Sequence, residues 1–395
     1  MKERVILHSD VNNFFASVEC ATKPELRDKP VAVTGNPEKR TGIILAKNEI
    51  AKKYGVKTGQ VIGEAKALCP ELVCLGPHYD LYEEISLRLH QLYLSYTNFV
   101  EPLGLDECWL DVSDSLKYLK KTGRQIADEI RQKVKQEFGF TVSVGVSFSK
   151  IFAKLGSDLK KPDCTTIIDK KNYEKITYDL PLNSIIGIGR RLEKKFNSIS
   201  VFTIGDFVKL EDGYLQHLMG VTGINLKQAL LGEENSPVAD YYTLPPPKSI
   251  GNGTTTIKDI VKRQDIEKVV FFLAEKVSAR MIKHKVVANT LSLSIKDNKL
   301  KKIHKSMKIS PTNSVKELAK NAMKIADQIW RYDYPVRAVR LRASSLASAD
   351  AVQLSFFDNK KDYSKALEHI NKKYGKIELA SNMSKFINTS KHVQE

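Results

Sequence analysis

The chain has 395 residues, 42% of them hydrophobic, which predicts a globular protein of several domains. Its formal net charge of +17 indicates a polyanionic partner, and no apolar stretch approaches the roughly 18 residues that span a bilayer. The five cysteines are scattered and form no CxxC pair, which disfavours structural zinc and a disulfide framework. We expect free thiols, no signal peptide, no membrane partner and a cytoplasmic location.

The first predicted element is a strand at residues 5–9, which runs directly into Asp10. Residues 101–111 read EPLGLDECWLD and place Asp106 and Glu107 at the start of another apolar run. Either segment alone fits a solvated acid at a strand end or in a turn. If they meet in space, however, three carboxylates require cations to neutralise them, and paired divalent ions are used for in-line displacement at phosphorus. The two segments together therefore favour phosphoryl transfer.

Residues 21–79 separate the first acid from the other two. They contain two short predicted strands, at residues 31–34 and 42–46, and a helix over residues 48–54. After them, the pattern predicts helices at residues 81–96 and 126–138 and strands at residues 107–112 and 141–148. With the first strand, these elements predict a small antiparallel sheet backed by helices.

Residues 166–235 consist of short helical segments. Within them, residues 185–196 read IIGIGRRLEKKF, the form of two helices joined by a glycine turn. Gly187 and Gly189 would let backbone N–H groups approach a phosphate at the start of the second helix. An ordinary tight turn is the alternative, but Arg190 and the basic residues that follow favour phosphate binding. Residues 219–223 (MGVTG) are a weaker candidate for a second such turn.

Residues 236–247 include three consecutive prolines and predict a linker. The elements beyond it follow in the order β-α-β-β-α-β: strands at residues 249–258, 286–295, 302–309 and 336–344, and helices at residues 266–283 and 315–330. Basic residues recur on three of these strands, among them Lys296, Arg340 and Arg342. Such residues often form only a solvated face, but their recurrence across one sheet favours a surface that follows a phosphate backbone.

Several segments resemble the Y-family, or translesion, DNA polymerases, most closely the DNA polymerase IV type. DVNNFFASVE and GLDECWLD match the two catalytic motifs of that family. Further matches follow in the family's order, at residues 29–33, 55–59, 143–162 and 187–196. The resemblance covers residues 1 to about 235 closely and extends more weakly to about 345.

The resemblance implies an α+β multidomain protein, a right-hand polymerase. Its parts would be a ferredoxin-like palm (residues 1–20 and 80–165), small fingers (21–79), a helical thumb with a helix-hairpin-helix (166–235), a linker (236–247), a β-α-β-β-α-β little finger (248–345) and a tail (346–395). The implied function is template-directed, error-prone synthesis past damaged bases, without proofreading, by a monomer that binds primer-template DNA and deoxynucleoside triphosphates.

The resemblance also implies the roles of single residues. Asp10 and Asp106 would bridge two Mg²⁺ ions, with Glu107 and the carbonyl of Val11 as further ligands. Phe15 matches the steric gate, a ring beneath the sugar that leaves no room for a 2′-hydroxyl. The adjacent Phe14 would also border the nucleotide, although of the two rings it is the candidate for the core.

Two lysines match residues that bind the triphosphate, Lys161 in DLKKP and Lys52 on the fingers helix. Glu49 stands where the family usually carries a tyrosine, and a carboxylate beside a triphosphate is repulsive. Either Glu49 points away or nucleotide binding is weakened; Lys47 is a candidate for compensation.

In the tail, residues 351–358 read AVQLSFFD, which resembles the peptide that docks replication proteins on the sliding clamp. The docking residues would be Gln353, Leu354, Phe356 and Phe357; a hydrophobic patch folded onto the little finger is the alternative.

Two other functions compete with polymerisation. A nucleotidyl cyclase also holds metals with two acids on a palm-like sheet, but it needs neither the glycine turn nor the basic C-terminal region. A non-catalytic DNA-bound protein on the same fold would be marked by loss of one of the three acids, and all three are present.

Overall fold

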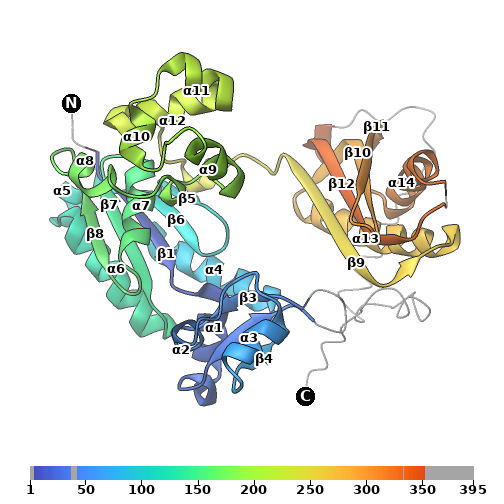
Figure 1. Cartoon of the computed structure of the whole chain (residues 1–395), viewed down its shortest axis with the longest axis horizontal. Helices are drawn as coiled ribbons and strands as arrows, with labels where there is room; N and C mark the ends of the chain where they lie inside the picture. The colour runs from blue at the N-terminus through green and yellow to red at the C-terminus, as the bar shows by residue number, and fades with distance from the viewer. Residues whose placement is uncertain (1–3, 37–41, 332, 352–395) are drawn as a thin grey trace. The chain divides into compact units, whose positions relative to one another are not determined.

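The computed structural model describes residues 4–36, 42–331 and 333–351, which divide into two compact units (Figure 1). The first unit comprises the described parts of residues 1–34 and 43–244, and the second includes the described residues from Pro245 onward. Within the described residues, no helix is both long and apolar enough to cross a bilayer. The five cysteines are free thiols, as expected.

A five-stranded sheet forms the framework of the first unit, in the order β5-β6-β1-β7-β8. Its strands are β1 (Ile6–Val11), β5 (Val100–Pro102), β6 (Glu107–Asp111), β7 (Val142–Ser147) and β8 (Thr165–Ile168). β1 pairs antiparallel with β6 and β7, and the register sets Asp10 directly opposite Glu107. The expectation of a wholly antiparallel sheet is wrong at one edge, where β8 runs parallel to β7. Parallel neighbours need a crossover, which α7 (Lys150–Leu159) supplies.

Helices cover both faces of this sheet. α4 (Tyr79–Leu94) and α6 (Gly123–Phe138) share a buried cluster with Leu7 of β1. The preceding residue, Ile6, packs instead with Ala153 of α7. Neighbouring strand residues point to opposite faces, so α7 lies on the other side. A side chain at Gly145 of β7 would collide with the Ala153 carbonyl, and glycine therefore lets α7 approach the sheet closely. The shorter helices of this region are α1 (Phe14–Thr22), the 3-10 helix Pro24–Leu26 and α5 (Ser115–Leu119).

A smaller three-stranded sheet, in the order β3-β2-β4, forms the region between the acids. Its elements are β2 (Val31–Thr34), β3 (Ile44–Lys47), α2 (Glu49–Lys53), α3 (Ile62–Leu68) and β4 (Val73–Leu75). The side chain of Asn48 accepts a hydrogen bond from the Ala51 amide and so begins α2. This cap fixes the direction in which the first residues of α2 point.

Short helices follow the first sheet: α8 (Tyr173–Thr177), the 3-10 helix Leu182–Ser184, α9 (Arg190–Asn197), α10 (Ile204–Val208), α11 (Asp212–Met219), α12 (Val221–Gln228) and a π-helical turn, Ala229–Glu233. Gly187 has a φ of +97°, and Gly189 is the N-cap of α9. The helix expected before this glycine turn is only the 3-10 turn, because Pro181 and Gly187 leave too short a segment between them. α11 and α12 meet at Gly220, within the weaker candidate turn.

Residues 236–247, expected to be a linker, are anchored in their first part. Val238 is buried against Ile6 and Trp109, and the amide of Ala239 donates to Glu101 Oε2 at 2.9 Å. A 3-10 helix, Tyr241–Thr243, follows.

The second unit is one four-stranded sheet with two helices. Its elements are β9 (Ser249–Ile260), α13 (Arg263–Lys283), β10 (Val286–Asp297), β11 (Lys302–Thr312), α14 (Val315–Ile329) and β12 (Val336–Ser348), followed by a 3-10 turn, Ala349–Ala351. The sheet order is β11-β10-β12-β9, all antiparallel. The predicted β-α-β-β-α-β order is confirmed.

Candidate active site

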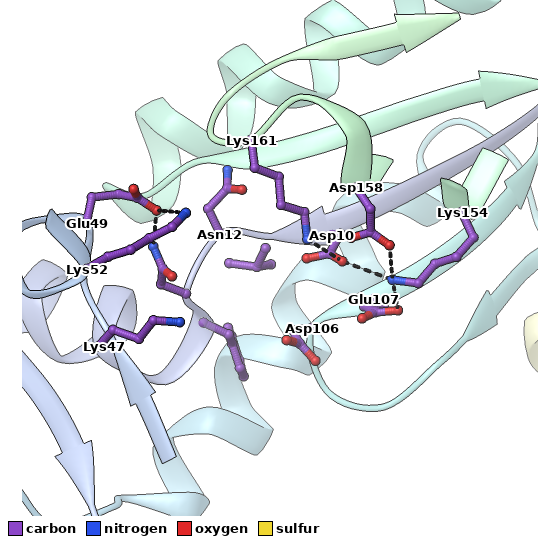
Figure 2. A pocket seen from close by; sticks show the side chains of 13 residues that line it. Asp10, Asn12, Lys47, Glu49, Lys52, Asp106, Glu107, Lys154, Asp158 and Lys161 are labelled. Atoms are coloured by element: carbon purple, nitrogen blue, oxygen red, sulfur yellow. Dashed lines mark hydrogen bonds and ion pairs between the residues drawn. The ribbon is translucent and has the colours of Figure 1, made fainter. Parts of the chain in front are cut away.

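Three carboxylates gather where β1 and β6 meet. Asp10 lies near the end of β1 and is 4% exposed, Glu107 is the first residue of β6 opposite it, and Asp106 occupies the preceding turn. The amide of Val11 donates to the Asp106 carbonyl at 3.0 Å, which ties the turn to the strand. These residues border a cavity of about 360 Å³ (Figure 2). The structure thus brings together the three acids that the sequence singled out.

Two lysines on and after α7 point into the same cluster (Figure 2). Lys161 Nζ lies 2.9 Å from Asp10 Oδ2 and 2.8 Å from Asp158 Oδ1. Lys154 Nζ lies 3.1 Å from Asp10 Oδ2 and 2.8 Å from Glu107 Oε2. Sequence reasoning found Lys161 but missed Lys154 and Asp158. The available signal was the spacing of Lys154 and Asp158, which lie four residues apart and share one face of α7, with Lys161 three residues further on.

Asp106 and Glu107 differ in pKa because their surroundings differ. Burial, followed by repulsion from Asp10 and Glu107, raises the pKa of Asp106 to about 6. For Glu107, burial acts to raise the pKa, but the neighbouring His8 and Lys154 side chains outweigh it and hold the pKa at about 2. A crowded, partly neutralised group of acids is a favourable place for a cation.

The donor chemistry fits a hard divalent cation. Three carboxylates and the carbonyl of Val11 offer only oxygen, which Mg²⁺ prefers. Within the described part of the chain, no three acidic, histidine or cysteine side chains are already arranged as a metal cage. The carboxylates of Asp10 and Glu107 are turned instead to the ammonium group of Lys154.

An aromatic group flanks the acids. Phe14 is buried, at 3% exposed, and also lines the cavity. Phe15 is partly exposed and does not line it; its ring stacks on Tyr82 at 4.4 Å and meets the edge of Tyr79. The Tyr82 hydroxyl donates to the buried Glu19 carboxylate at 2.7 Å, which fixes the stacked pair. Sequence reasoning missed these three supporting residues.

The edge of the cavity formed by the end of β3 and by α2 carries Lys47, Glu49 and Lys52 (Figure 2). Glu49 Oε1 accepts a hydrogen bond from Asn13 Nδ2 at 2.8 Å and lies 3.4 Å from Lys52 Nζ. Asn13 can reach it because its backbone is left-handed, with a φ of 56°. Glu49 therefore lines the cavity, with its charge met by an amide and an ammonium group.

None of the remaining candidates that the structure describes is among the residues that line the cavity. Gly187, Gly189 and Arg190 surround the start of α9. In the second unit, β12 and β10 pair so that Arg342 lies opposite Ser292 and Arg340 opposite Ser294. Lys296, two residues beyond Ser294, shares their face of the sheet, opposite the buried Leu293. The clamp-like residues, Gln353, Leu354, Phe356 and Phe357, lie outside the described residues.

The comparisons with known proteins agree along most of the chain. Residues 9–158 match the impB/mucB/samB family, and residues 247–356 match the impB/mucB/samB family C-terminal domain. DNA polymerase IV of Acetivibrio thermocellus is 43% identical over 359 residues, which cover 90% of this chain and 90% of that protein. DNA polymerase IV of Bacillus velezensis is 33% identical over 385 residues, covering 95% of this chain and 91% of that protein.

A solved structure supports the fold independently. A Y-family DNA polymerase chimera matches with a TM-score of 0.78 over 87% of this chain and 99% of that chain. The sequence identity is 21%, so this likeness concerns the fold alone.

Proposed function

We propose a reaction and a task for this chain from the premise that it belongs to the impB/mucB/samB family, as a Y-family DNA polymerase of the DNA polymerase IV type. It is a DNA-directed DNA polymerase. The expected α+β multidomain fold of a right-hand polymerase is confirmed. The proposed task is error-prone synthesis past damaged template bases, without proofreading, on primer-template DNA and deoxynucleoside triphosphates.

The observation that carries the reaction is the register that sets Asp10 against Glu107, with Asp106 in the adjoining turn. We assign these carboxylates, with the Val11 carbonyl, as the ligands of two Mg²⁺ ions. When bound, the ions would supply activation of the primer hydroxyl and charge neutralisation at the triphosphate.

The chain's own side chains would complete the nucleotide site. Lys161, Lys52 and Lys47 border the cavity and offer positive charge to the triphosphate. Phe15, braced by Tyr82, would exclude a 2′-hydroxyl from the space beneath the sugar. The basic face of β10 and β12 would hold the DNA backbone, as would the turn before α9. This division leaves affinity for DNA largely independent of the catalytic acids.

Primer extension tests this function. The purified chain should extend a primed template with each deoxynucleotide in Mg²⁺ or Mn²⁺, opposite both an undamaged and a damaged base. Products copied only from undamaged templates would refute the bypass task. Cyclic nucleotide formed without a template, in place of extended primer, would favour the cyclase alternative.

Replacing Glu49 by tyrosine should lower the apparent KM for nucleotide. The change removes a negative charge from the cavity, frees Lys52 and restores a hydroxyl donor. We expect a decrease of up to about fivefold, since a partly exposed charge pair contributes about 0.2–1 kcal/mol. Steady-state extension at varied nucleotide concentration measures it, with Glu49→Gln as the control that removes only the charge. An unchanged or higher KM in both variants would contradict a role for Glu49 beside the triphosphate.

We further propose that the chain works as a monomer in the cytoplasm and is tethered to the sliding clamp by residues 353–357. Alanine at Gln353, Leu354, Phe356 and Phe357 should remove stimulation by the clamp and leave the clamp-free rate unchanged, because tethering raises local concentration without touching the site. Calorimetry with purified clamp measures the loss of binding. Equal binding by both chains would refute the assignment, and a slower clamp-free rate would favour packing on the little finger.

A further inference from the structure

Lys154 occupies a central position among the acids. Its side chain is 12% exposed, and its ammonium group lies within 3.3 Å of the carboxylates of Asp10, Glu107 and Asp158. The close approach of α7 to β7, which Gly145 permits, brings it there. Figure 2 shows the ammonium group of Lys154 directed at the carboxylates of the cluster.

The two neighbouring lysines have different partners. Lys161 pairs with Asp10 and Asp158, whereas Lys154 also reaches Glu107. Among the described residues, Lys154 is thus the lysine that bridges the two facing acids of β1 and β6. The ammonium group of Lys154 is thus paired with three carboxylates. A buried ammonium group is costly unless it is paired in this way.

Asp10 and Glu107 are also the carboxylates to which we assign the divalent ions. We propose that Lys154 is a positioning residue, an internal counter-cation that holds Asp10 and Glu107 together and competes with the divalent ion for them. The inference rests on the proposed metal site. In this role Lys154 acts on the acids before substrate binds and does not need to contact the triphosphate.

If Lys154 competes with the divalent ion, a neutral side chain at this position should raise the affinity for the ion. Without the ammonium group, the acids repel one another, and a divalent ion relieves that repulsion. Lys154→Met, which is similar in length and uncharged, should therefore unfold at a lower temperature in EDTA and bind Mn²⁺ more tightly. A residue that merely supported the metal ligands would weaken Mn²⁺ binding when removed.

The test uses the full chain without DNA or nucleotide. Mn²⁺ affinity is measured from the spin-resonance signal of the free ion, and the unfolding temperature is measured in EDTA and at rising Mn²⁺ concentration. For Lys154→Met we expect an affinity higher by about threefold to tenfold and a decrease of about 3 °C or more in EDTA that Mn²⁺ restores. Lys154→Arg retains the charge and should resemble the wild type.

Lys150→Met is the matched control on the same helix. Lys150 pairs with Glu101 at 2.7 Å, outside the acid cluster. Its loss should lower the unfolding temperature without altering Mn²⁺ affinity. Equal or weaker Mn²⁺ binding by Lys154→Met would overturn the inference while leaving the proposed metal site intact. Absence of Mn²⁺ binding by the wild type would overturn both.

A measurement on the wild type covers the case in which Lys154→Met does not fold. Acetic anhydride labelling, read residue by residue by mass spectrometry, reports whether an amine is free. Mn²⁺ should raise labelling of Lys154 severalfold and leave that of Lys150 unchanged. Labelling of Lys154 that is insensitive to Mn²⁺ would refute the competition.

Discussion

Replacing Asp106 by alanine should abolish primer extension and leave affinity for DNA close to that of the wild type. Asp106 lies in the turn before β6, beside Asp10 and Glu107, where burial and like charge raise its pKa to about 6. A divalent ion would relieve that crowding. Because metal charge stabilisation amounts to several kcal/mol, we expect the extension rate to fall by about 10³-fold or more.

DNA affinity should persist because we assign it to other parts of the chain. The basic residues of β10, β12 and the turn before α9 belong to other elements than the acids, and phosphate contacts dominate non-specific binding. Fluorescence anisotropy with labelled primer-template, at two salt concentrations, measures the affinity beside single-turnover extension. Unchanged extension by the purified variant would contradict the metal assignment.

Asp111 supplies the matched control on the same strand. Its Oδ1 accepts a hydrogen bond from the Ser113 amide at 3.0 Å, at the end of β6 remote from Asp106. Asp111→Asn keeps the shape of that turn and should retain extension. Equal losses in the two variants would indicate general damage to β6.

The acids could be predicted from the sequence because each stands at the border of a strand. Strand alternation and the apolar runs identify β1 and β6, and pairing them places Asp10 near Glu107. Lys154 could not be found in the same way, because its partner Asp10 is 144 residues away in sequence. Periodicity shows which face of α7 is polar. The residues that this face contacts depend on how closely α7 packs against the sheet, and the absence of a side chain at Gly145 permits the close approach.

Two other features show the same limit. The parallel pairing of β8 with β7 follows from the path of α7, which no local pattern of residues 165–168 reveals. The position of Glu49 depends on the left-handed backbone of Asn13, which turns its amide toward the fingers. Sequence resemblance located Glu49 on α2 but left its direction open. Contacts between distant segments therefore had to come from the structure.

Replacing Phe15 by alanine should greatly weaken the discrimination against ribonucleotides. The ring belongs to the residue after the cavity-lining Phe14, is partly exposed and stacks on Tyr82, whose hydroxyl donates to Glu19. A ring braced in this way cannot easily yield to a 2′-hydroxyl beneath the sugar. We expect the ratio of kcat/KM for deoxynucleotide over ribonucleotide to fall by about 10²-fold, the size of a strong steric selection.

The choice of Phe15 also makes the experiment interpretable. Phe14 is buried in the core between the five-stranded sheet and its helices, where loss of its ring would cost about 3–5 kcal/mol of folding stability and obscure any kinetic effect. Loss of the partly exposed Phe15 ring removes chiefly an aromatic stack, about 0.5–1.5 kcal/mol. Tyr82→Phe retains the stack and loses only the bond to Glu19, so its discrimination should fall far less. Single-nucleotide incorporation with paired ribo- and deoxynucleotides measures the discrimination ratio of each variant. A ratio in Phe15→Ala equal to that of the wild type would show that another residue bounds the sugar. The cavity-lining Phe14 would then be the next candidate.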